Sequence, residues 1–188
     1  SHVDEIDEDI DAVISVNARR YGKGILTRRF DKMSRLAFAE GTNLVLINQV
    51  GGSGDIVYDG TSGVLNRDGR LILLLKSFEE DIKIIDTEAK NEPFEVPFTT
   101  YNDRTRMIYE AACLGLRDYF HKNGYTKACV GLSGGIDSAV VACLAVGALG
   151  KENVRVLLMP SPFTPNESVE DAKRLAENLG VEYSVLPI

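Results

Sequence analysis

Residues 128–186 alternate short apolar segments with longer helical patterns, and this alternation constrains the fold more than any other feature of the sequence. The expected strands cover 128–132, 154–159 and 183–186, and the expected helices cover 138–149 and 167–179. Right-handed crossovers place such strands in one parallel sheet. Ligands of these folds bind beyond the carboxyl ends of the strands. The sequence therefore predicts a βαβαβ unit with a site at that edge.

A further helix precedes this unit, and a segment without a regular pattern precedes the helix. From Arg106 to Gly124, apolar residues fall on one helical face, and the glycine is typical of a helix C-terminus. Segment 86–104 holds two prolines and scattered charges but no sustained period, as linkers do. We therefore expect one domain in residues 1–88, a linker in 89–104 and a second domain in 105–188.

The first half of the chain is predicted to pack one helix against a run of strands. Apolar residues recur at helical spacing from Gly22 to Glu40. Segments rich in Val, Ile and Leu predict strands at 12–16, 43–50, 55–58, 62–65, 70–75 and 81–85. Asp68-Gly69 predicts a hairpin, since glycine takes the positive φ that such turns require. Segment 51–54 is expected to be a loop and Asp59-Gly60 a turn, without catalytic content.

The composition indicates a globular protein and disfavours some partners. The chain has 188 residues, 44% of them hydrophobic, which suffices for a packed core. Its formal net charge of -7 provides no basic surface for a phosphate backbone, so nucleic acid is not an expected partner. The apolar runs are far shorter than the roughly 18 residues that cross a bilayer, so no membrane span is expected. The acidic segment 4–11 lacks the features of a signal peptide.

The three cysteines suit a reducing compartment better than a disulfide framework, because their number is odd. Cys113, Cys129 and Cys143 each lie in apolar or helical surroundings, so all three are expected in the core. The sequence therefore predicts a cytoplasmic location.

A glycine-rich loop joins the first strand of the C-terminal unit to its first helix. It consists of Gly131, Leu132, Ser133, Gly134, Gly135, Ile136, Asp137 and Ser138. Unpaired backbone N–H groups and the helix dipole attract anions at a helix start. Gly134 and Gly135 allow a phosphate to approach the backbone closely. The hydroxyls of Ser133 and Ser138 add hydrogen-bond donors, so the loop is predicted to bind phosphate.

Asp137 would place a carboxylate beside that phosphate. The two anions would repel each other unless a cation lay between them, so Asp137 is predicted to be a magnesium ligand. The Gly-Lys-Ser/Thr and Gly-x-Gly-x-x-Gly patterns of other phosphate loops do not occur in this loop. The alternative is a turn in which Asp137 and Ser138 only cap the helix. The order strand, loop, helix favours a Mg-nucleotide site.

The run Ser133 to Ser138 and the pattern around it resemble the adenine-nucleotide ATP pyrophosphatases, which include NAD⁺, GMP, argininosuccinate and asparagine synthetases and tRNA-modifying enzymes. Segment 158–180, which begins Leu-Met-Pro-Ser, is similar to the NAD⁺ synthetase pattern, although 162–165 lacks the usual tyrosine and serines. Met159 and Pro160 are expected to line an adenine pocket, and the alternative for Met159 is a place in the core. Ser168-x-x-Asp171 predicts a capping box.

Segments 48–52 and 55–62 are similar to the nitrilase-like glutaminase domain of glutamine-dependent NAD⁺ synthetases, and the domain order also agrees. In that family a serine and a Lys or Arg help to bind glutamine, and the matching positions here are Asn17 and Lys23. The resemblance implies that the Glu-Lys-Cys catalytic triad of the glutaminase precedes Asp11. No complete catalytic set is therefore expected in this chain, which resembles the middle portion of such an enzyme.

Together, these resemblances imply an α/β chain: the C-terminal part of a nitrilase-like sandwich, then the first βαβαβ of a doubly wound parallel sheet. They imply a ligase that uses ATP and Mg²⁺ to join deamido-NAD⁺ to ammonia, taken from glutamine, through an adenylate. The full-length protein is expected to be a homo-oligomer, and the isolated chain to be inactive. The alternatives are another amidating or thiolating ATP pyrophosphatase and a nucleotide-binding module without turnover.

Overall fold

The computed structural model describes residues 10–86 and 104–188. The chain divides into two compact units between Ala111 and Ala112, within helix α3 (Arg104–Lys122). The predicted linker 89–104, apart from Arg104, and most of the acidic segment 4–11 lie outside the described residues. Each unit combines helices with strands.

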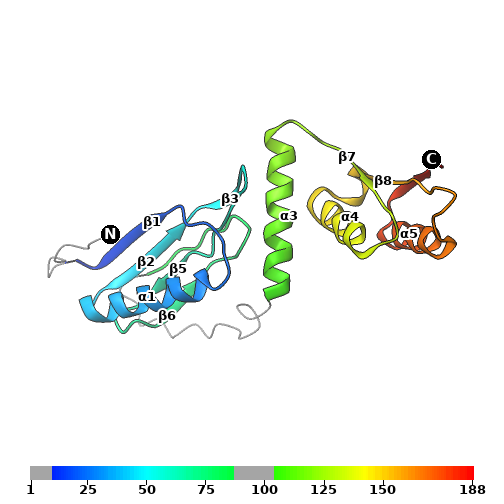
Figure 1. Ribbon diagram of the computed structural model, residues 1–188. Coiled ribbons are helices and arrows are strands. Elements are labelled where there is room, and N and C mark those ends of the chain that lie inside the picture. The colour runs from blue at the N-terminus through cyan, green and yellow to red at the C-terminus, as the bar shows by residue number, and fades with distance from the viewer. Residues whose placement is uncertain (1–9, 87–103) are drawn as a thin grey trace. The chain divides into compact units, whose positions relative to one another are not determined.

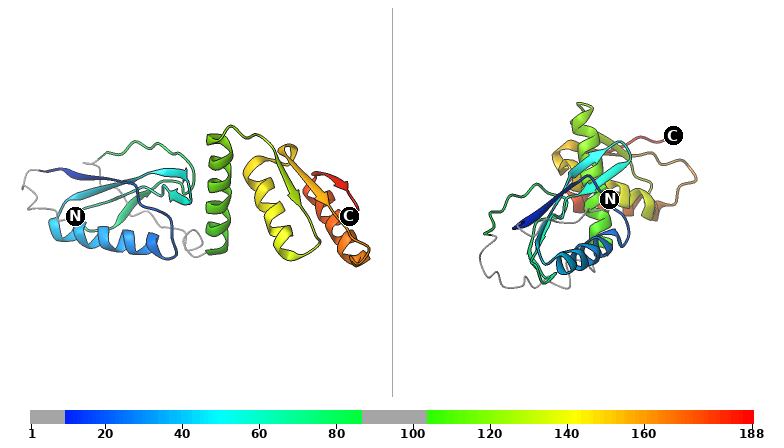
Figure 2. Two further views of the ribbon diagram at one scale, coloured as in Figure 1. Left: turned by 45° about the horizontal axis from the view of Figure 1, so that its top comes forward. Right: turned by 90° about the vertical axis from the view of Figure 1, so that its left-hand side faces the viewer.

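The first unit is a sheet with helix α1 along one face (Figures 1 and 2). Its elements are β1 (Ala12–Asn17), α1 (Ile25–Glu40), β2 (Asn43–Asn48), β3 (Val50–Ser53), β4 (Ile56–Asp59), β5 (Gly63–Leu65) and β6 (Leu71–Leu74). The sheet has the order β1-β2-β5-β6, in which β1 and β2 are parallel and the other pairs antiparallel. Met33 and Ala37 of α1 pack against Leu44, Leu46 and Leu65 of the sheet.

The predicted helix, the predicted hairpin and five of the six predicted strands are present with shifted bounds, whereas the predictions for 51–54 and 81–85 are wrong. The helix begins at Ile25 instead of Gly22, and the Asp68-Gly69 hairpin joins β5 to β6, with a φ of 73° at Gly69. Segment 51–54 is not simply a loop, because Gly51 and Gly52 lie in β3 and pair with β4. Segment 81–85 forms no helix or strand, since no described strand pairs with it.

A buried ion pair links α1 to the end of β4. Arg29 Nη2 donates to Asp59 Oδ1 at 2.9 Å, and both side chains are 1% exposed. The predicted turn at Asp59-Gly60 is wrong, because Asp59 ends β4 and Gly60, with a φ of 63°, forms a bridge with Ser77. The sequence pattern also does not anticipate that Asp59 is buried and paired with Arg29.

The second unit confirms the predicted βαβαβ order. It contains β7 (Ala128–Gly131), α4 (Ile136–Leu149), the 3-10 helix η1 (Lys151–Asn153), β8 (Val154–Leu158), α5 (Asn166–Leu179) and β9 (Glu182–Val185). The strands form a parallel sheet in the order β7-β8-β9. Right-handed crossovers between strands in sequence order put α4 and α5 on one face, where the two helices contact each other. The carboxyl ends of all three strands therefore share one edge.

Helix α3 extends this layer of helices. Arg117 Nε donates to the carbonyl of Ala148 in α4 at 3.2 Å, and Cys113 Sγ lies 3.8 Å from the carbonyl of Leu144. The helix ends as predicted before Gly124, which has a φ of 73°.

The expectation that all three cysteines lie in the core is wrong for Cys129. Cys113 is buried and Cys143 is partly buried, but Cys129 is exposed. Successive side chains of a strand point to opposite faces. Because Val130 packs against the core below α4 and α5, its neighbour Cys129 lies on the other face of the sheet.

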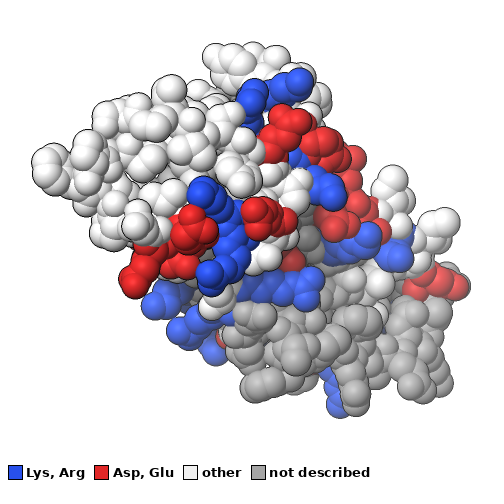
Figure 3. All heavy atoms as spheres, turned by 90° about the vertical axis from the view of Figure 1, so that its right-hand side faces the viewer, with Lys and Arg blue, Asp and Glu red and all other residues white. Residues whose placement is uncertain are grey.

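Within residues 10–86 and 104–188, none of the helices combines the length and the apolar character that crossing a membrane requires. Figure 3 shows one face of the molecule, on which basic and acidic side chains lie interspersed beside an area that has neither.

The Arg29–Asp59 pair yields a stability prediction. Asp59→Ala leaves the Arg29 charge buried without its partner, so the free energy of unfolding should fall by about 3–5 kcal/mol. Urea denaturation of the purified protein measures this loss.

Glu79→Ala is the matched control, because it breaks the Lys76–Glu79 pair, whose side chains are 63% and 62% exposed. Water replaces that contact, so its unfolding midpoint should stay unchanged. Equal midpoints for the two variants would contradict the assigned role of the buried pair.

Candidate nucleotide-binding site

The loop between β7 and α4 leaves the sheet at the carboxyl end of its first strand. Leu132 is 3% exposed and packs in the core, and its N–H donates to the carbonyl of Leu157 at 2.9 Å. This bond extends the pairing with β8 one residue beyond β7. The exposed part of the loop therefore begins at Ser133, in a position fixed by the sheet.

Helix α4 begins without a side-chain cap. Its N-cap residue is Gly135, in extended conformation, which has no side chain to accept from the first N–H groups of the helix. The first N–H groups of a helix have no partner within it, and the helix dipole adds positive potential. The N-cap position belongs to Gly135, and Asp137 and Ser138 lie in the first turn that follows it. The arrangement leaves backbone donors available to an anion.

The two predicted serines hold the loop closed. Ser138 Oγ donates to the carbonyl of Gly135 at 2.9 Å and accepts from the N–H of Ser133 at 3.1 Å. The two hydroxyl oxygens lie 3.0 Å apart, and the N–H of Gly135 donates to Ser133 Oγ at 3.3 Å. Either hydroxyl would have to exchange one of these bonds to donate to a phosphate. The serines thus have a structural role that their sequence pattern does not reveal.

Position 134 requires a glycine both because of its backbone conformation and because of close packing. Its φ is 85°, and a Cβ atom there would lie 2.2 Å from the carbonyl oxygen of Ser168 and 2.9 Å from its Cα. The loop therefore touches the backbone at the start of α5. Gly135 differs, because a Cβ there would meet only Ser133 Oγ, at 3.5 Å.

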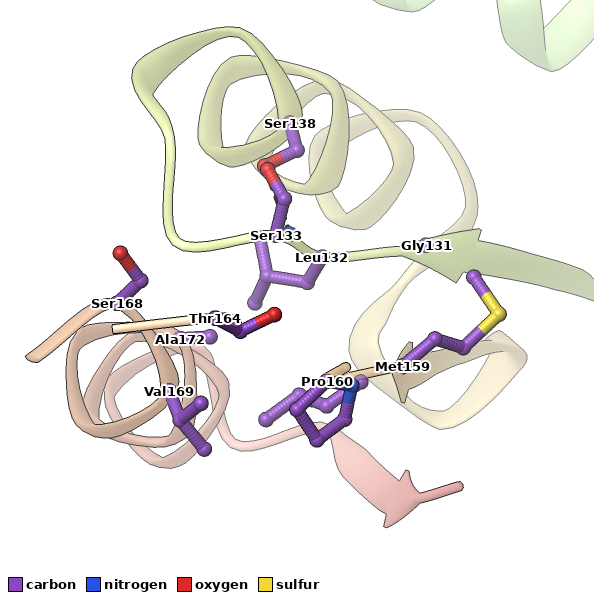
Figure 4. A pocket seen from close by; sticks show the side chains of 11 residues that line it. Gly131, Leu132, Ser133, Ser138, Met159, Pro160, Thr164, Ser168, Val169 and Ala172 are labelled. Atoms are coloured by element: carbon purple, nitrogen blue, oxygen red, sulfur yellow. Dashed lines mark hydrogen bonds between the residues drawn. The ribbon is translucent and has the colours of Figure 1, made fainter. Parts of the chain in front are cut away.

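A cavity of about 260 Å³ lies between this loop and the segment after β8 (Figure 4). Its lining includes five of the residues predicted to bind ATP, namely Gly131, Leu132, Ser133, Ser138 and Met159. The other predicted residues, Gly134, Gly135, Ile136 and Asp137, do not line it. Met159 is 46% exposed and lies at one end of the cavity, with Ser168 at the other. The cavity is thus next to the start of α4, not around it.

Pro160, which was expected beside Met159, also lines the cavity, but several lining residues were not predicted, namely Leu158, Thr164, Ser168, Val169 and Ala172. Most of them follow the carboxyl end of β8, where the rule for parallel sheets places ligands, so strand order could have indicated them. Ser161 and Thr164 close the turn between them: the N–H of Ser161 donates to Thr164 Oγ1 at 2.9 Å. The predicted capping box is wrong, because α5 starts after Pro165 and Ser168 lies inside its first turn.

Asp137 is a single carboxylate in the first turn of α4. Among the described residues, no group of three or more His, Cys, Asp or Glu side chains could hold a metal ion. Magnesium is commonly bound by one or two carboxylates together with substrate phosphates. Asp137 therefore fits an ion that arrives with a nucleotide better than a resident metal site.

The two residues predicted to bind glutamine lie in the first unit, at the ends of the connection between β1 and α1. Asn17 ends β1, and its Nδ2 donates to the carbonyl of Ser15 at 3.0 Å. Lys23 is exposed and directly precedes Gly24, the N-cap of α1. The side chain of Lys23 is thus accessible to a ligand.

Residues 108–188 match the model of the NAD synthase family. The chain is 38% identical over 192 residues to the glutamine-dependent NAD(+) synthetase of Synechocystis sp., covering 99% of the chain and 34% of that protein. It is 42% identical over 174 residues to the enzyme of the same name from Aquifex aeolicus, covering 76% of the chain and 31% of that protein. The chain is related to the glutamine-dependent NAD⁺ synthetases.

Solved structures agree with this relationship. The glutamine-dependent NAD⁺ synthetase of Acinetobacter baumannii, in complex with ADP, is similar with a TM-score of 0.87 and 36% identity, over 96% of this chain and 34% of that one. The synthetase of Cytophaga hutchinsonii shares the fold, with a TM-score of 0.75 at 19% identity, over 93% of this chain and 36% of that one. The chain spans about a third of the length of these relatives.

Gly134 and Gly124 form a matched pair for testing the contact with α5. Both have positive φ, 85° and 73°, so alanine should cost each about 1–2 kcal/mol in backbone strain. Around Gly124 nothing lies within 4 Å of an added Cβ, whereas at Gly134 the backbone of Ser168 does. Gly134→Ala should therefore destabilise the protein clearly more than Gly124→Ala.

Urea denaturation of both variants measures the difference. Gly135→Ala adds a second control, since its φ of -83° suits alanine. Equal losses for Gly134→Ala and Gly124→Ala would show that the loop does not depend on its contact with Ser168.

Proposed function

We propose that this chain is part of a glutamine-dependent NAD⁺ synthetase, which amidates deamido-NAD⁺ with ATP and with ammonia taken from glutamine. The observation that carries the proposal is the uncapped start of α4 beside a cavity, at the carboxyl edge of a parallel sheet. Similarity to these synthetases through both units of the chain supports it.

The proposal assigns residues 1–88 to a nitrilase-like glutaminase domain, 89–104 to a linker and 105–188 to an ATP-pyrophosphatase domain. The first assignment is supported by the sheet with α1 on one face, which is half of an α/β sandwich. The last is supported by the βαβαβ order and by the family match of residues 108–188.

The nucleotide is proposed to be ATP, with its phosphates at the start of α4. The free N–H groups of the first turn would bind the phosphate oxygens, and the cavity beside Met159 would receive the adenine. The ADP complex of the Acinetobacter baumannii synthetase supports a nucleotide of this class.

In the proposed reaction, the carboxylate of deamido-NAD⁺ attacks the α-phosphate of ATP, the bond to pyrophosphate breaks, and an acyl adenylate forms. Ammonia then attacks the acyl carbon and displaces AMP. The N–H groups at the start of α4 would hold the leaving pyrophosphate and stabilise the charge that develops on it. Mg²⁺, held by Asp137 and the phosphates, would supply positive charge at the same place.

Glutamine is proposed to bind at the connection between β1 and α1. The exposed ammonium of Lys23 would pair with the α-carboxylate of glutamine, and the amide of Asn17 would donate to it. These are the two residues of this chain that match the family positions.

Asp137 provides the test of the ATP-dependent step. In the intact protein, Asp137→Ala should lower Mg-dependent pyrophosphate release, with deamido-NAD⁺ present, by about a hundredfold, or about 3 kcal/mol of transition-state stabilisation. A coupled pyrophosphate assay measures the rate.

Asp171→Ala is the control, because Asp171 is another exposed carboxylate, 62% accessible, that pairs with the exposed Arg174 at 3.7 Å. It should leave the rate unchanged. Near-normal release by Asp137→Ala would remove Asp137 from the mechanism. If the unmodified protein bound Mg-ATP but released no pyrophosphate, the chain would belong to a nucleotide-binding protein without turnover.

A further inference from the structure

The first unit contains a buried polar cluster that the ATP-dependent step does not use. We call Arg29, Asn48, Asp59 and Thr61 the Asp59 cluster; their exposed fractions are 3%, 6%, 1% and 1%. Three side chains donate to the Asp59 carboxylate: Arg29 Nη2 at 2.9 Å, Asn48 Nδ2 at 3.0 Å and Thr61 Oγ1 at 3.2 Å. A charge that is so fully desolvated needs such partners.

The backbone around this cluster is strained. Thr61 has a φ of 48° and Phe78 a φ of 60°, in the left-handed region that side chains other than glycine rarely adopt. Both strained residues contact the Asp59 carbonyl: the N–H of Phe78 donates to it at 2.9 Å, and Thr61 Oγ1 lies 3.1 Å from it. Strain of this kind persists only where surrounding contacts fix it, and it concentrates at functional sites.

The cluster is also not optimised for stability. Arg29 Nε is buried and has no hydrogen-bond partner in the part of the chain that the structure describes. A buried ion pair is often no more stabilising than apolar residues of the same volume. Stability alone therefore does not explain why charge is placed here.

The cluster fixes the connection between β1 and α1. Asn48 Oδ1 accepts from the N–H of Arg19 at 2.8 Å, and its Nδ2 donates to the carbonyl of Arg19 at 3.2 Å. A single side chain thus satisfies both backbone groups of a residue that lies in no regular strand. Asp59 in turn orients Asn48, because it accepts from the same Nδ2.

Two further contacts hold the connection at Tyr21. The N–H of Tyr21 donates to the carbonyl of Val57 at 2.7 Å, and the Tyr21 ring packs edge-on against Phe78, with centroids 5.3 Å apart. Burial, and then the charge of Asp59, raise the pKa of Tyr21 above its usual 10. The phenol therefore stays neutral beside the cluster at physiological pH.

We propose that Asn48 and Asp59 are positioning residues for the connection between Asn17 and Lys23, and so for glutamine binding there. This inference rests on the proposed function. Neither residue touches the ligand; each acts through the backbone of the connection that carries Asn17 and Lys23. Losing the cluster should weaken glutamine use but leave the ammonia-dependent step intact.

Asn48→Ala in the intact protein tests this inference, with Asn43→Ala as the control. Asn43 is also a buried asparagine of β2, 7% exposed, whose Nδ2 donates to a distant backbone carbonyl, that of Asp11, at 3.2 Å. Asn48→Ala should raise the KM for glutamine about tenfold, as expected for a lost buried hydrogen bond, whereas Asn43→Ala should not. The rate with added ammonia should stay the same in both variants.

A second variant separates positioning from folding. Arg29→Met combined with Asp59→Leu replaces the buried pair by apolar side chains, which keeps the unit folded where single substitutions fail. Its unfolding midpoint should be near that of the unmodified protein, while its KM for glutamine is raised. An unchanged KM in this variant, or equal KM values for Asn48→Ala and Asn43→Ala, would overturn the inference.

Hydrogen exchange distinguishes this failure from failure of the proposed function. If the unmodified protein made no NAD⁺ from glutamine, the proposed function would be wrong, and exchange at the Arg19 amide would still test the cluster. Faster exchange there in Asn48→Ala than in Asn43→Ala would support the positioning role. Equal exchange in the two variants would refute it.

Discussion

The close contact between the Gly134 backbone and the carbonyl of Ser168 fixes the geometry of the candidate site. It joins the loop after the first strand of the parallel sheet to the helix after the second strand. Both segments begin at the same edge of the sheet, and Ser168 also lines the cavity between them. Any displacement of α5 would therefore move the loop, and with it the free N–H groups at the start of α4.

The elements of the second unit could be predicted from the sequence because each has its own periodicity. The predicted strand 81–85 is wrong because a strand also needs a neighbouring strand to pair with. None of the described strands pairs with this segment, and Ile82 and Ile84 are 90% and 99% exposed. Gly51 and Gly52 show the converse. They have no propensity for strands, yet they lie in β3 because β4 pairs with them.

The candidate site could be predicted only where its polar residues and glycines follow one another in the sequence. The loop from Gly131 to Ser138 could be recognised because its glycines, hydroxyls and carboxylate are neighbours in sequence. Thr164 and Ser168 escaped prediction because the sheet, not the sequence, brings them to the cavity. The packing that requires glycine at position 134 could not be predicted either, because its neighbour, Ser168, lies in α5. The sequence pattern indicates only that this position suits a glycine conformation.

The two candidate ligand sites differ in how their shape is maintained. The hydroxyls that close the loop before α4 belong to residues five apart, whereas Asn48 and Arg19, which fix the connection after β1, are 29 apart. The hydrogen bonds of the loop before α4 are thus local, although Gly134 also packs against Ser168. The connection before α1 depends on distant residues, because its backbone partners come from β2 and β4. Buried charge at Asp59 and strained backbone at Thr61 and Phe78 are therefore expected where a candidate ligand-binding segment lacks secondary structure of its own.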